Sequence, residues 1–298
     1  MKAIQHIHHI SAIVGNPTEN IKFYRDVLQL KLIKKTVNYD DPSTYHLYFS
    51  NDSVDNGTIL TFFNWPDAYK GRVGAGQVST IAFRIPQGTS DVWAQHLINH
   101  NVHVTRMELF DSNTLMFKDT HGLSLALVED TDVRDTAAII GFHGVTMLSE
   151  QPEQTIQLLT AEMGLKQLND NPNETHLATV GEWQHHVVVK KVFPNVAGRW
   201  GVGVVHHIAW SVPDKQTQLA WRTSLANKGY KLTDVKERFY FKAVYMAEPG
   251  NIIFEFATVG PGFTIDEPFD KLGRNLMLPP RLEEQREELE RQLPTINI

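Results

Sequence analysis

The chain contains no cysteine. This absence excludes disulfide bonds, thiolate zinc sites and cysteine nucleophiles in a single step. Any metal that the protein binds must therefore be held by histidine, aspartate, glutamate or tyrosine side chains, or by backbone oxygen atoms.

Long apolar runs and basic blocks are also missing. No stretch approaches the roughly 18 apolar residues that a membrane span needs, and the N-terminal residues lack the charged-then-apolar pattern of a signal peptide. The 28 lysines and arginines are outnumbered by 34 aspartates and glutamates, which gives a formal net charge of −6. We therefore expect a cytoplasmic protein with no membrane partner and no nucleic-acid partner.

Histidine, in contrast, is concentrated at one point. Three of the 14 histidines fall within residues 6–9, at the start of the predicted first strand. A polar surface strand and a metal site are the two explanations, and the rest of the chain must distinguish between them.

Internal repetition divides the chain into two similar halves. The segment GRVGAGQVSTIAFRIP at residues 71–86 matches GRWGVGVVHHIAWSVP at residues 198–213, with a constant offset of 127. The glycines precede a strand and lack the G-x-G-x-x-G spacing after one, so we reject a nucleotide-binding loop.

Each half divides again, which gives four units of one strand, one helix and further strands. The helices are predicted near residues 17–28, 88–100, 151–163 and 215–228. In the third unit the later strands are predicted at ETHLATV and HHVVVKKV, and in the fourth unit KLTDVKER is predicted as a strand. The pattern predicts an α+β fold in which four βαβββ modules form two incomplete barrels.

Aligning the four units groups the candidate ligands. The first strands share one position, which holds His9, Thr80, His143 and His207. The last strands, aligned on their glycine turns, group Phe62, Leu127 and Glu255. A glutamate within the apolar run IIFEFA is costly to bury unless a charged group pairs with it.

These positions predict a metal site. Two histidines and one carboxylate are the facial ligand set of non-haem Fe(II) oxygenases, and the doublets His8-His9 and His206-His207 supply the histidines. A structural or surface role is the alternative for each histidine taken alone, and His143 competes for a place in the set. We predict surface or packing roles for the remaining candidates, His46, His185 and His186.

More specific motifs are present as well. They are IHHISAI, VVHHIAW, Arg238, Tyr245 with Glu255, and the tail LGRNLMLPPRLEEQREELERQLP. Together with the repeats they resemble the vicinal oxygen chelate superfamily, which includes glyoxalase I, fosfomycin-resistance proteins and extradiol dioxygenases. Within it, the chain most resembles the hydroquinone 1,2-dioxygenase branch over nearly its whole length. The resemblance implies two halves, at residues 1–133 and 138–262, followed by a tail at residues 263–298.

The resemblance also implies a ligand set. It assigns His9, His207 and Glu255 to the metal, which pairs the first module with the fourth. Ordinary extradiol enzymes pair neighbouring modules, which here would replace His9 with His143, and the repeats alone do not choose between the two.

Four further residues are implied to orient the substrate. A hydroquinone has para oxygens, only one of which reaches the metal, so the surrounding residues must hold the rest of the ring. The implied residues are His8, Ser11, Arg238 and Tyr245.

Each of these four has its own sequence argument and its alternative. The turn MAEPGN would place Tyr245 across a hairpin from Glu255, although a core tyrosine is the alternative. Arg238 could fix an anionic oxygen or form a surface salt bridge. Ser11 shares the strand face of His9 and could contact the substrate, although a packing role is the alternative. His8 points to the opposite face of a regular strand, so a role for it requires an irregular strand.

The predicted function is an Fe(II)-dependent dioxygenase that opens hydroquinone-type rings with O2, in quinone detoxification or aromatic catabolism. The same ligands would accept Mn(II). The alternatives are a catechol extradiol dioxygenase, a glyoxalase-like isomerase, which usually needs a second carboxylate ligand, and a metal-free module that binds aromatic compounds.

The C-terminal segment and the assembly state complete the predictions. The segment PPRLEEQREELERQLP is predicted to form a charged helix begun by proline, with an i, i+4 pair between Arg286 and Glu290. The oligomeric state stays open, with a homo-oligomer among the alternatives.

Overall fold

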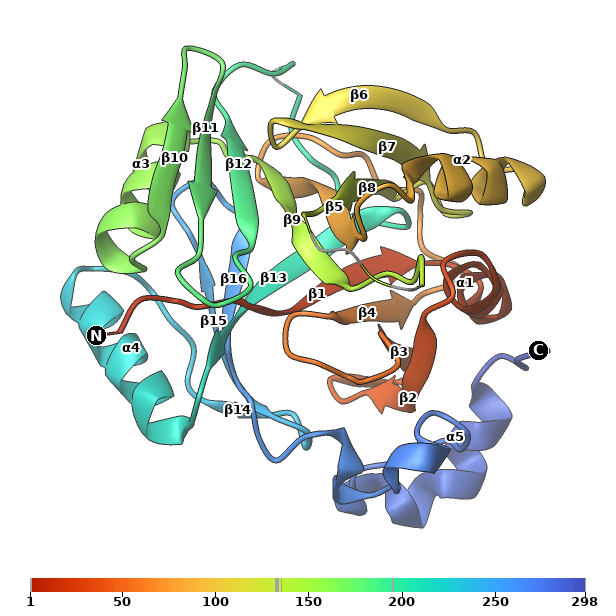
Figure 1. Ribbon diagram of the computed structural model, residues 1–298. Helices are drawn as coiled ribbons and strands as arrows, with labels where there is room; N and C mark the ends of the chain where they lie inside the picture. Colours follow the sequence, from red (N-terminus) through yellow and green to blue (C-terminus); the bar gives the residue numbers. More distant parts are fainter. Residues whose placement is uncertain (1, 132–133, 135, 195, 298) are drawn as a thin grey trace.

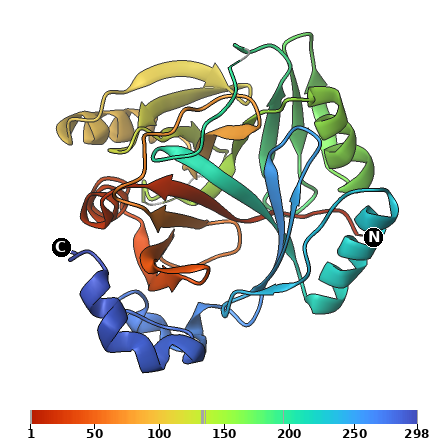
Figure 2. The same cartoon turned by 180° about the vertical axis from the view of Figure 1, so that it is seen from behind.

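The computed structural model describes residues 2–131, 134, 136–194 and 196–297. Across these residues the strands form two curled eight-stranded sheets (Figures 1 and 2). The first sheet has the order β14-β15-β16-β13-β1-β4-β3-β2, and the second has the order β10-β11-β12-β9-β5-β8-β7-β6. The predicted α+β fold of βαβββ modules in two incomplete barrels is confirmed.

The element bounds are as follows. The strands of the first sheet are β1 Ile7–Val14, β2 Lys31–Asn38, β3 Asp41–Ser50, β4 Ile59–Asn64, β13 Val204–Val212, β14 Lys236–Glu237, β15 Lys242–Ala247 and β16 Ile253–Thr258. Those of the second sheet are β5 Gln77–Ile85, β6 Thr105–Leu109, β7 Ser112–Lys118, β8 Ser124–Glu129, β9 Gly141–Leu148, β10 Lys166–Asp170, β11 Glu174–Ala178 and β12 His186–Lys190. The α-helices are α1 Pro17–Lys22, α2 Ser90–Asn99, α3 Pro152–Gln157, α4 Lys215–Asn227 and α5 Arg286–Gln292.

One sheet combines the first and fourth modules, which are distant in sequence, and the other combines the neighbouring second and third modules. Strand β1 of the first module pairs antiparallel with β13 of the fourth, and β5 of the second pairs antiparallel with β9 of the third. Each half of the sequence therefore contributes one module to each sheet. The division at residues 1–133, 138–262 and 263–298 stays a prediction about the sequence, and residues 1, 133 and 298 lie outside the described residues.

The predicted helices are present in all four modules. The first begins at the N-cap Asn16, whose side chain accepts hydrogen bonds from the backbone of Thr18 and Glu19. It continues beyond α1 as a π-helical turn over Phe23–Val27, and α3 continues in the same way over Leu158–Glu162. Among the described residues, no helix is long and apolar enough to cross a membrane.

Two strand predictions need correction. Strand β10 was missed because all five of its residues are exposed at the sheet edge and show no apolar alternation. The strand predicted at KLTDVKER is wrong except for β14. Before β14 the chain meets β15 at Thr233, whose backbone N–H donates to the Tyr245 carbonyl at 2.9 Å, whereas the Tyr245 backbone N–H donates to the Thr233 side-chain oxygen at 3.0 Å, so the backbone ladder is incomplete.

The repeated glycine segments connect the two sheets. They run side by side, and Arg72 and Arg199 exchange backbone hydrogen bonds of 3.0 and 2.8 Å. A Cβ atom on Gly74 would lie 2.2 Å from the carbonyl oxygen of Val196, so only glycine fits this crossing. The repeat therefore has a packing role, which agrees with the rejection of a nucleotide loop.

The C-terminal tail covers the first sheet. Three 3₁₀ turns, Phe263–Ile265, Phe269–Lys271 and Pro280–Gln285, lead into α5, which lies beside β2 and β3 in Figure 1. The Lys34 ammonium is fully buried and lies 2.6 Å from Asp266 and 2.5 Å from Glu267, which holds the tail against β2. The charged C-terminal helix is confirmed, including the ion pair between Arg286 and Glu290.

Candidate metal centre

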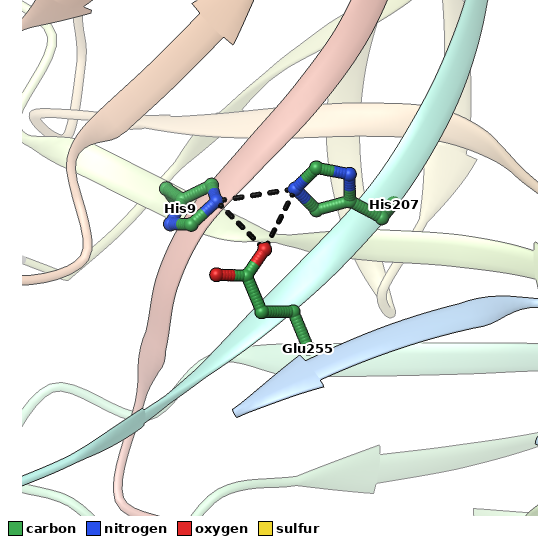
Figure 3. A group of neighbouring side chains, drawn as sticks. All are labelled: His9, His207 and Glu255. Atoms are coloured by element: carbon green, nitrogen blue, oxygen red, sulfur yellow. Dashed lines mark hydrogen bonds and ion pairs between the residues drawn. The ribbon is translucent and has the colours of Figure 1, made fainter. Parts of the chain in front are cut away.

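Three side chains converge from three adjacent strands of the first sheet (Figure 3). His9 lies on β1, His207 on β13 and Glu255 on β16, and these strands are consecutive in the sheet. The two Nε2 atoms of the histidines are 3.2 Å apart, and Glu255 Oε2 lies 2.9 Å from His207 Nε2 and 3.4 Å from His9 Nε2. The pairing of the first module with the fourth therefore brings together the three predicted ligands.

The chemistry of this cluster fits a divalent cation. Glu255 is fully buried, and neither of its oxygens accepts a hydrogen bond of good geometry from the described residues. Burial opposes ionisation, but His9 and His207 outweigh it and hold the pKa of the Glu255 carboxyl well below its usual range. A buried carboxylate without hydrogen bonds needs a cation beside it. Two imidazoles and one carboxylate suit Fe(II) or Mn(II) and leave coordination positions free.

Each histidine doublet contains a β-bulge, which changes the direction of its first member. The register between β1 and β13 shifts at His8 and again at His206. Both residues consequently reach their neighbours: His8 Nδ1 lies 2.8 Å from His9 Nδ1, and His206 Nδ1 lies 2.7 Å from His207 Nδ1. The irregularity that a role for His8 required is therefore present.

These contacts set the tautomers of the two candidate ligands. An Nε2 atom that binds a metal carries no proton, so Nδ1 of His9 and of His207 must each donate to its neighbour. Burial lowers the pKa of His8 and of His206 to about 3, so both are neutral and able to accept. His8 packs against Phe241 behind His9, and its geometry suits orientation of His9.

His143 lies away from this cluster. It sits on β9 in the second sheet, where its ring stacks on that of His186 with centroids 4.5 Å apart. The alternative ligand set that replaces His9 with His143 is therefore not assembled in this fold. His185 has the packing role predicted for it, because its Nδ1 accepts a hydrogen bond of 2.8 Å from the Ile7 backbone.

A cavity of about 440 Å³ opens beside the two candidate histidine ligands. Among the predicted substrate-contacting residues, Ser11, Arg238 and Tyr245 line it, whereas His8 is not among the lining residues. The remaining lining residues are mainly aromatic or polar: Asn38, Tyr39, Asp40, Asp41, His46, Tyr48, Phe63, Trp65, His206, Thr233, Phe241 and Ile253. Such a site, apolar with a few convergent polar groups, is typical of small-molecule binding.

Arg238 and Tyr245 form a connected pair at one side of the cavity. Arg238 Nε donates a 3.1 Å hydrogen bond to the Tyr245 hydroxyl, and its Nη2 lies 2.8 Å from Asp40. Tyr245 is directly opposite Glu255 in the β15–β16 hairpin, as the turn predicted. Burial raises the pKa of the Tyr245 phenol, so its hydroxyl keeps its proton at neutral pH.

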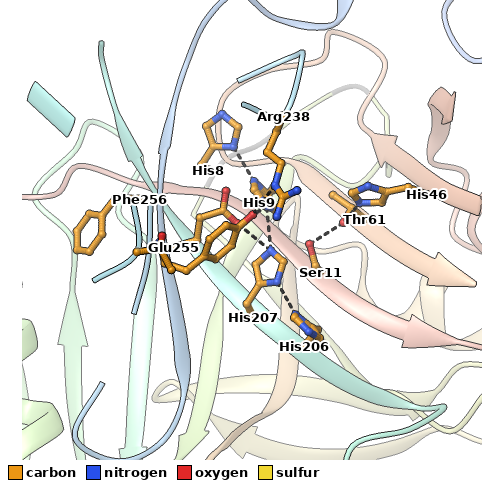
Figure 4. A network of polar contacts seen from close by, with 12 residues as sticks. His8, His9, Ser11, His46, Thr61, His206, His207, Arg238, Glu255 and Phe256 are labelled. Atoms are coloured by element: carbon orange, nitrogen blue, oxygen red, sulfur yellow. Dashed lines mark hydrogen bonds and ion pairs between the residues drawn. The ribbon is translucent and has the colours of Figure 1, made fainter. Parts of the chain in front are cut away.

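His46 is a cavity residue that sequence reasoning missed. The predicted packing role is present, because the His46 ring lies 4.2 Å from that of Tyr48 and 4.4 Å from that of Phe63, but the prediction missed that His46 also lines the cavity, with Nε2 2.9 Å from Thr61 Oγ1. Thr61 in turn lies 2.7 Å from Ser11 Oγ (Figure 4). No local pattern identified His46, because β3 contains a single histidine and no doublet. Its place at the cavity depends on contacts between strands.

The alignment of the last strands also needs correction by one residue. In the fourth module, Glu255 pairs with Ala209, which lies two residues after His207. In the first module, the residue two after His9 is Ser11, and it pairs with Thr61, so Thr61 is the counterpart of Glu255. Phe62, Leu127 and Phe256 instead face the apolar core. In Figure 4 Phe256 points away from the cluster, as expected for the neighbour of an inward-facing strand residue.

Comparisons with known proteins agree with this architecture. The family model for the Glyoxalase/Bleomycin resistance protein/Dioxygenase superfamily matches residues 6–256. "Putative ring-cleaving dioxygenase MhqO" of Bacillus subtilis (strain 168) is 43% identical and aligns with 96% of this chain and 95% of its own. "Chlorohydroquinone/hydroquinone 1,2-dioxygenase" of Sphingobium indicum is 32% identical, with 96% and 95% covered.

Solved structures extend the comparison. A Bacillus subtilis crystal structure that is 42% identical superposes with a TM-score of 0.95 and covers 100% of this chain and 99% of its own. Glyoxalase I from Zea mays is only 13% identical but has a TM-score of 0.65 over 85% of this chain and 92% of its own, so it shares the fold. By its family model, its relatives and its two-sheet architecture, the chain belongs to the glyoxalase, bleomycin resistance protein and dioxygenase superfamily.

Proposed function

We propose that this protein is an Fe(II)-dependent dioxygenase that opens hydroquinone-type aromatic rings with O2, next to a hydroxyl-bearing carbon. Mn(II) could replace Fe(II) in the same ligand set. The proposal is supported by the relatives named for ring cleavage and, in this chain, by one observation above all. His9, His207 and Glu255 converge as a buried three-residue cluster beside a cavity of suitable size.

The number of protein ligands favours a dioxygenase over an isomerase. The strand pairing makes Thr61 the counterpart of Glu255 in the first module. A glyoxalase-like isomerase usually has a second carboxylate, whereas Thr61 is neutral and is hydrogen-bonded to His46 and Ser11. Three protein ligands would leave adjacent positions for substrate and O2.

The proposed role of the metal is to couple electron transfer between the aromatic ring and O2. The protein residues would bind and orient the substrate around it. Arg238 stays charged and faces the cavity beside Tyr245, so it would hold an oxygen of the substrate that carries negative charge. The Tyr245 hydroxyl would donate a hydrogen bond to a substrate oxygen and would pass that proton to the oxygen during ring opening, regaining a proton from water afterwards.

The first members of the two doublets, His8 and His206, would orient the candidate metal ligands His9 and His207. His8 and His206 accept hydrogen bonds from Nδ1 of His9 and His207, which fixes both imidazoles with Nε2 toward the metal. The bulges are needed for this arrangement, because in regular strands these side chains would face the opposite side of the sheet.

Oxygen uptake tests the proposal. Protein loaded anaerobically with Fe(II) should consume O2 with methylhydroquinone or chlorohydroquinone and form a ring-opened product, in excess of autoxidation measured without enzyme. Catechol serves as the parallel substrate. His9→Ala should lose both bound iron and oxygen uptake, whereas the matched variant His143→Ala, at the equivalent repeat position in the second sheet, should keep both.

Other outcomes would favour the alternatives. Uptake with catechol alone would indicate an extradiol dioxygenase. Iron-loaded protein that consumes no oxygen with any of the three would contradict the dioxygenase proposal and favour an isomerase. Protein that binds aromatic compounds equally well without metal would favour a metal-free binding module.

A further inference from the structure

The curled first sheet brings its two edge strands, β2 and β14, together beside the cavity. Strand β2 ends at Asn38 and is followed by a turn that contains Tyr39 and Asp40, and β14 ends at Glu237, directly before Arg238. Arg238 Nη2 lies 2.8 Å from Asp40 Oδ2, so an ion pair joins the two edges of the sheet. Tyr39, Asp40 and Arg238 all line the cavity. The direction of the Arg238 side chain therefore depends on how the two turns are held.

The turn that carries Arg238 has an unusual backbone. Phe239 has a φ angle of 62°, in the left-handed region that a phenylalanine rarely adopts. Two hydrogen bonds close the turn, from the Arg238 N–H to the Phe241 carbonyl at 2.9 Å and from the Tyr240 N–H to the Arg238 carbonyl at 2.7 Å. Backbone in such a conformation persists only where the surrounding structure holds it. Contacts that hold Tyr240 therefore hold Arg238 as well.

The C-terminal tail supplies these contacts to Tyr240. The tyrosine is 1% exposed, its ring stacks on that of Phe263 with centroids 5.1 Å apart, and its hydroxyl donates a 2.8 Å hydrogen bond to Asp266 Oδ2. The other oxygen of Asp266 lies 2.6 Å from the Lys34 ammonium on β2. In Figure 1 the tail lies below both β14 and β2. The tail thereby fixes the turn of Arg238 to the opposite edge strand of the sheet.

The tail also holds the turn of Asp40. Arg281 Nη2 donates a 2.8 Å hydrogen bond to the Tyr39 carbonyl, and its guanidinium lies 6.0 Å from the centroid of the Tyr39 ring. Asp40 is ionised, because Arg238 holds the pKa of its carboxyl below the usual range. The Asp40 side chain is 70% exposed, and an exposed ion pair is weak by itself. The pair keeps its geometry because the tail holds the turns on both sides of it.

We propose that the C-terminal tail positions Arg238 for substrate binding, and that Asp266 and Arg281 are the positioning residues that hold the two turns. The inference rests on the proposed function, because it takes Arg238 as a residue that binds the substrate. The three candidate metal ligands belong to the inner strands β1, β13 and β16 and to neither turn. Loss of the tail contacts should therefore weaken substrate binding and leave metal binding unchanged.

Two variants each remove one contact with little loss of packing. Tyr240→Phe deletes the hydroxyl but keeps the stacked ring and the pair between Lys34 and Asp266, and Arg281→Met deletes the hydrogen bond to Tyr39 but keeps an unbranched stem. In oxygen uptake with methylhydroquinone, each should raise KM by roughly threefold to tenfold, the value of one hydrogen bond. The kcat should stay within about twofold of wild type, because binding of the substrate and of the transition state is weakened alike. The iron content should not change.

The control variant lies in the same tail. Arg286 forms ion pairs with Glu283 and Glu290 and donates a hydrogen bond to the Leu276 carbonyl, and all three partners belong to the tail. Arg286→Ala removes an arginine of the tail without touching either turn. It should therefore keep the wild-type KM.

A double-mutant cycle shows whether the two contacts act through Arg238. Arg238→Ala should itself raise KM, and adding Tyr240→Phe or Arg281→Met to it should cause no further rise. A general structural effect would instead raise KM by the same factor with and without Arg238. That result, or a wild-type KM in both single variants, would overturn the inference.

The Nε–H group of Arg238 gives a readout that does not require turnover. It donates a 3.1 Å hydrogen bond to the Tyr245 hydroxyl from a side chain that is 19% exposed, so in ¹⁵N-arginine-labelled, metal-free protein it should exchange slowly with water. The signal is assigned by its loss in Arg238→Lys. Exchange should be faster in Tyr240→Phe and Arg281→Met and unchanged in Arg286→Ala.

The two readouts separate this inference from the proposed function. Unchanged exchange of the Arg238 Nε–H in both tail variants would overturn the inference, whatever the oxygen uptake. Faster exchange in protein that consumes no O2 would support the positioning of Arg238 and overturn the ring-cleavage proposal alone.

Discussion

Replacing Glu255 with glutamine should affect the metal-bound protein much more than the metal-free protein. Glutamine keeps the shape of the side chain but removes its charge. In the metal-free protein Glu255 is fully buried, and the cost of burying its charge is offset by His207 and His9, which lie 2.9 and 3.4 Å from its Oε2 and hold the pKa of the carboxyl low. Because glutamine loses both the burial cost and these two ion pairs, we expect the metal-free variant to melt at the wild-type temperature or slightly below it.

The metal-bound form should be destabilised much more strongly. Removing one partner of a buried charge pair costs about 3–5 kcal/mol, which corresponds to a loss of metal affinity of roughly a thousandfold. At a metal concentration of about 100 times the wild-type Kd, binding stabilises the wild type by about 2.7 kcal/mol. In a chain of this size that raises Tm by about 5 °C. For the variant the same concentration lies below Kd, so the rise should nearly vanish.

Differential scanning calorimetry with and without metal measures both effects. The matched control is Glu248→Gln, a buried glutamate in the turn of the same hairpin that does accept hydrogen bonds, from Thr155 at 2.6 Å and from the Ile252 backbone at 3.0 Å. This control should lower Tm in both states and keep the metal-induced rise. The reasoning would be refuted if Glu255→Gln kept that rise, or if it destabilised the metal-free protein as much as the control.

Three further predictions concern other parts of the molecule. Lys34→Met should destabilise the protein by about 3–5 kcal/mol in urea unfolding, because the buried Glu267 and the partly buried Asp266 lose their cation, whereas the surface variant Arg286→Ala should cost less than about 1 kcal/mol. Equal effects of the two variants would contradict the anchoring of the tail by Lys34. Burial holds the pKa of His185 well below that of the unfolded chain, near 6.5, so wild-type stability should fall by about 1 kcal/mol between pH 7 and 5.5 on account of this residue. Urea titrations at both pH values measure this fall in the free energy of unfolding. The fall should be smaller in His185→Gln than in the wild type, whereas His100→Gln should show the wild-type fall. Tyr245→Phe should lower kcat for hydroquinone oxygen uptake by roughly a hundredfold or more while iron content is unchanged, and wild-type turnover would exclude a proton-transfer role.

The fold and the ligand candidates were predictable from particular residues. The offset of 127 between the glycine segments revealed the halves, and alignment of the first strands of the four units placed His9 and His207 at equivalent positions. Glu255 was conspicuous because a charge within an apolar strand demands a partner. Tyr245 could be placed opposite it because the length of a hairpin turn sets the register between its strands. All of these are local signals that depend on neighbours in sequence.

Other features depended on contacts between distant segments. Whether β13 pairs with β1 or with a neighbouring module is decided by packing of whole modules, and this choice determined that His9 rather than His143 lies beside His207. The bulges at His8 and His206 exist only in the paired strands, where they change the face that a side chain occupies. His46 became a cavity residue because β3 lies beside β4, whose Thr61 it contacts.

The sequence by itself thus determined the modules, the two histidine doublets and the single carboxylate. These features can be recognised within one strand, because periodicity and the cost of burying a charge depend on neighbouring residues in the sequence. The tertiary structure decided which modules meet, which member of each doublet faces the cavity, and which side chains complete the opposite wall. Side chains separated by almost 200 residues, such as those of His9 and His207, meet through the packing energy of the assembled barrel, and no local pattern encodes that energy.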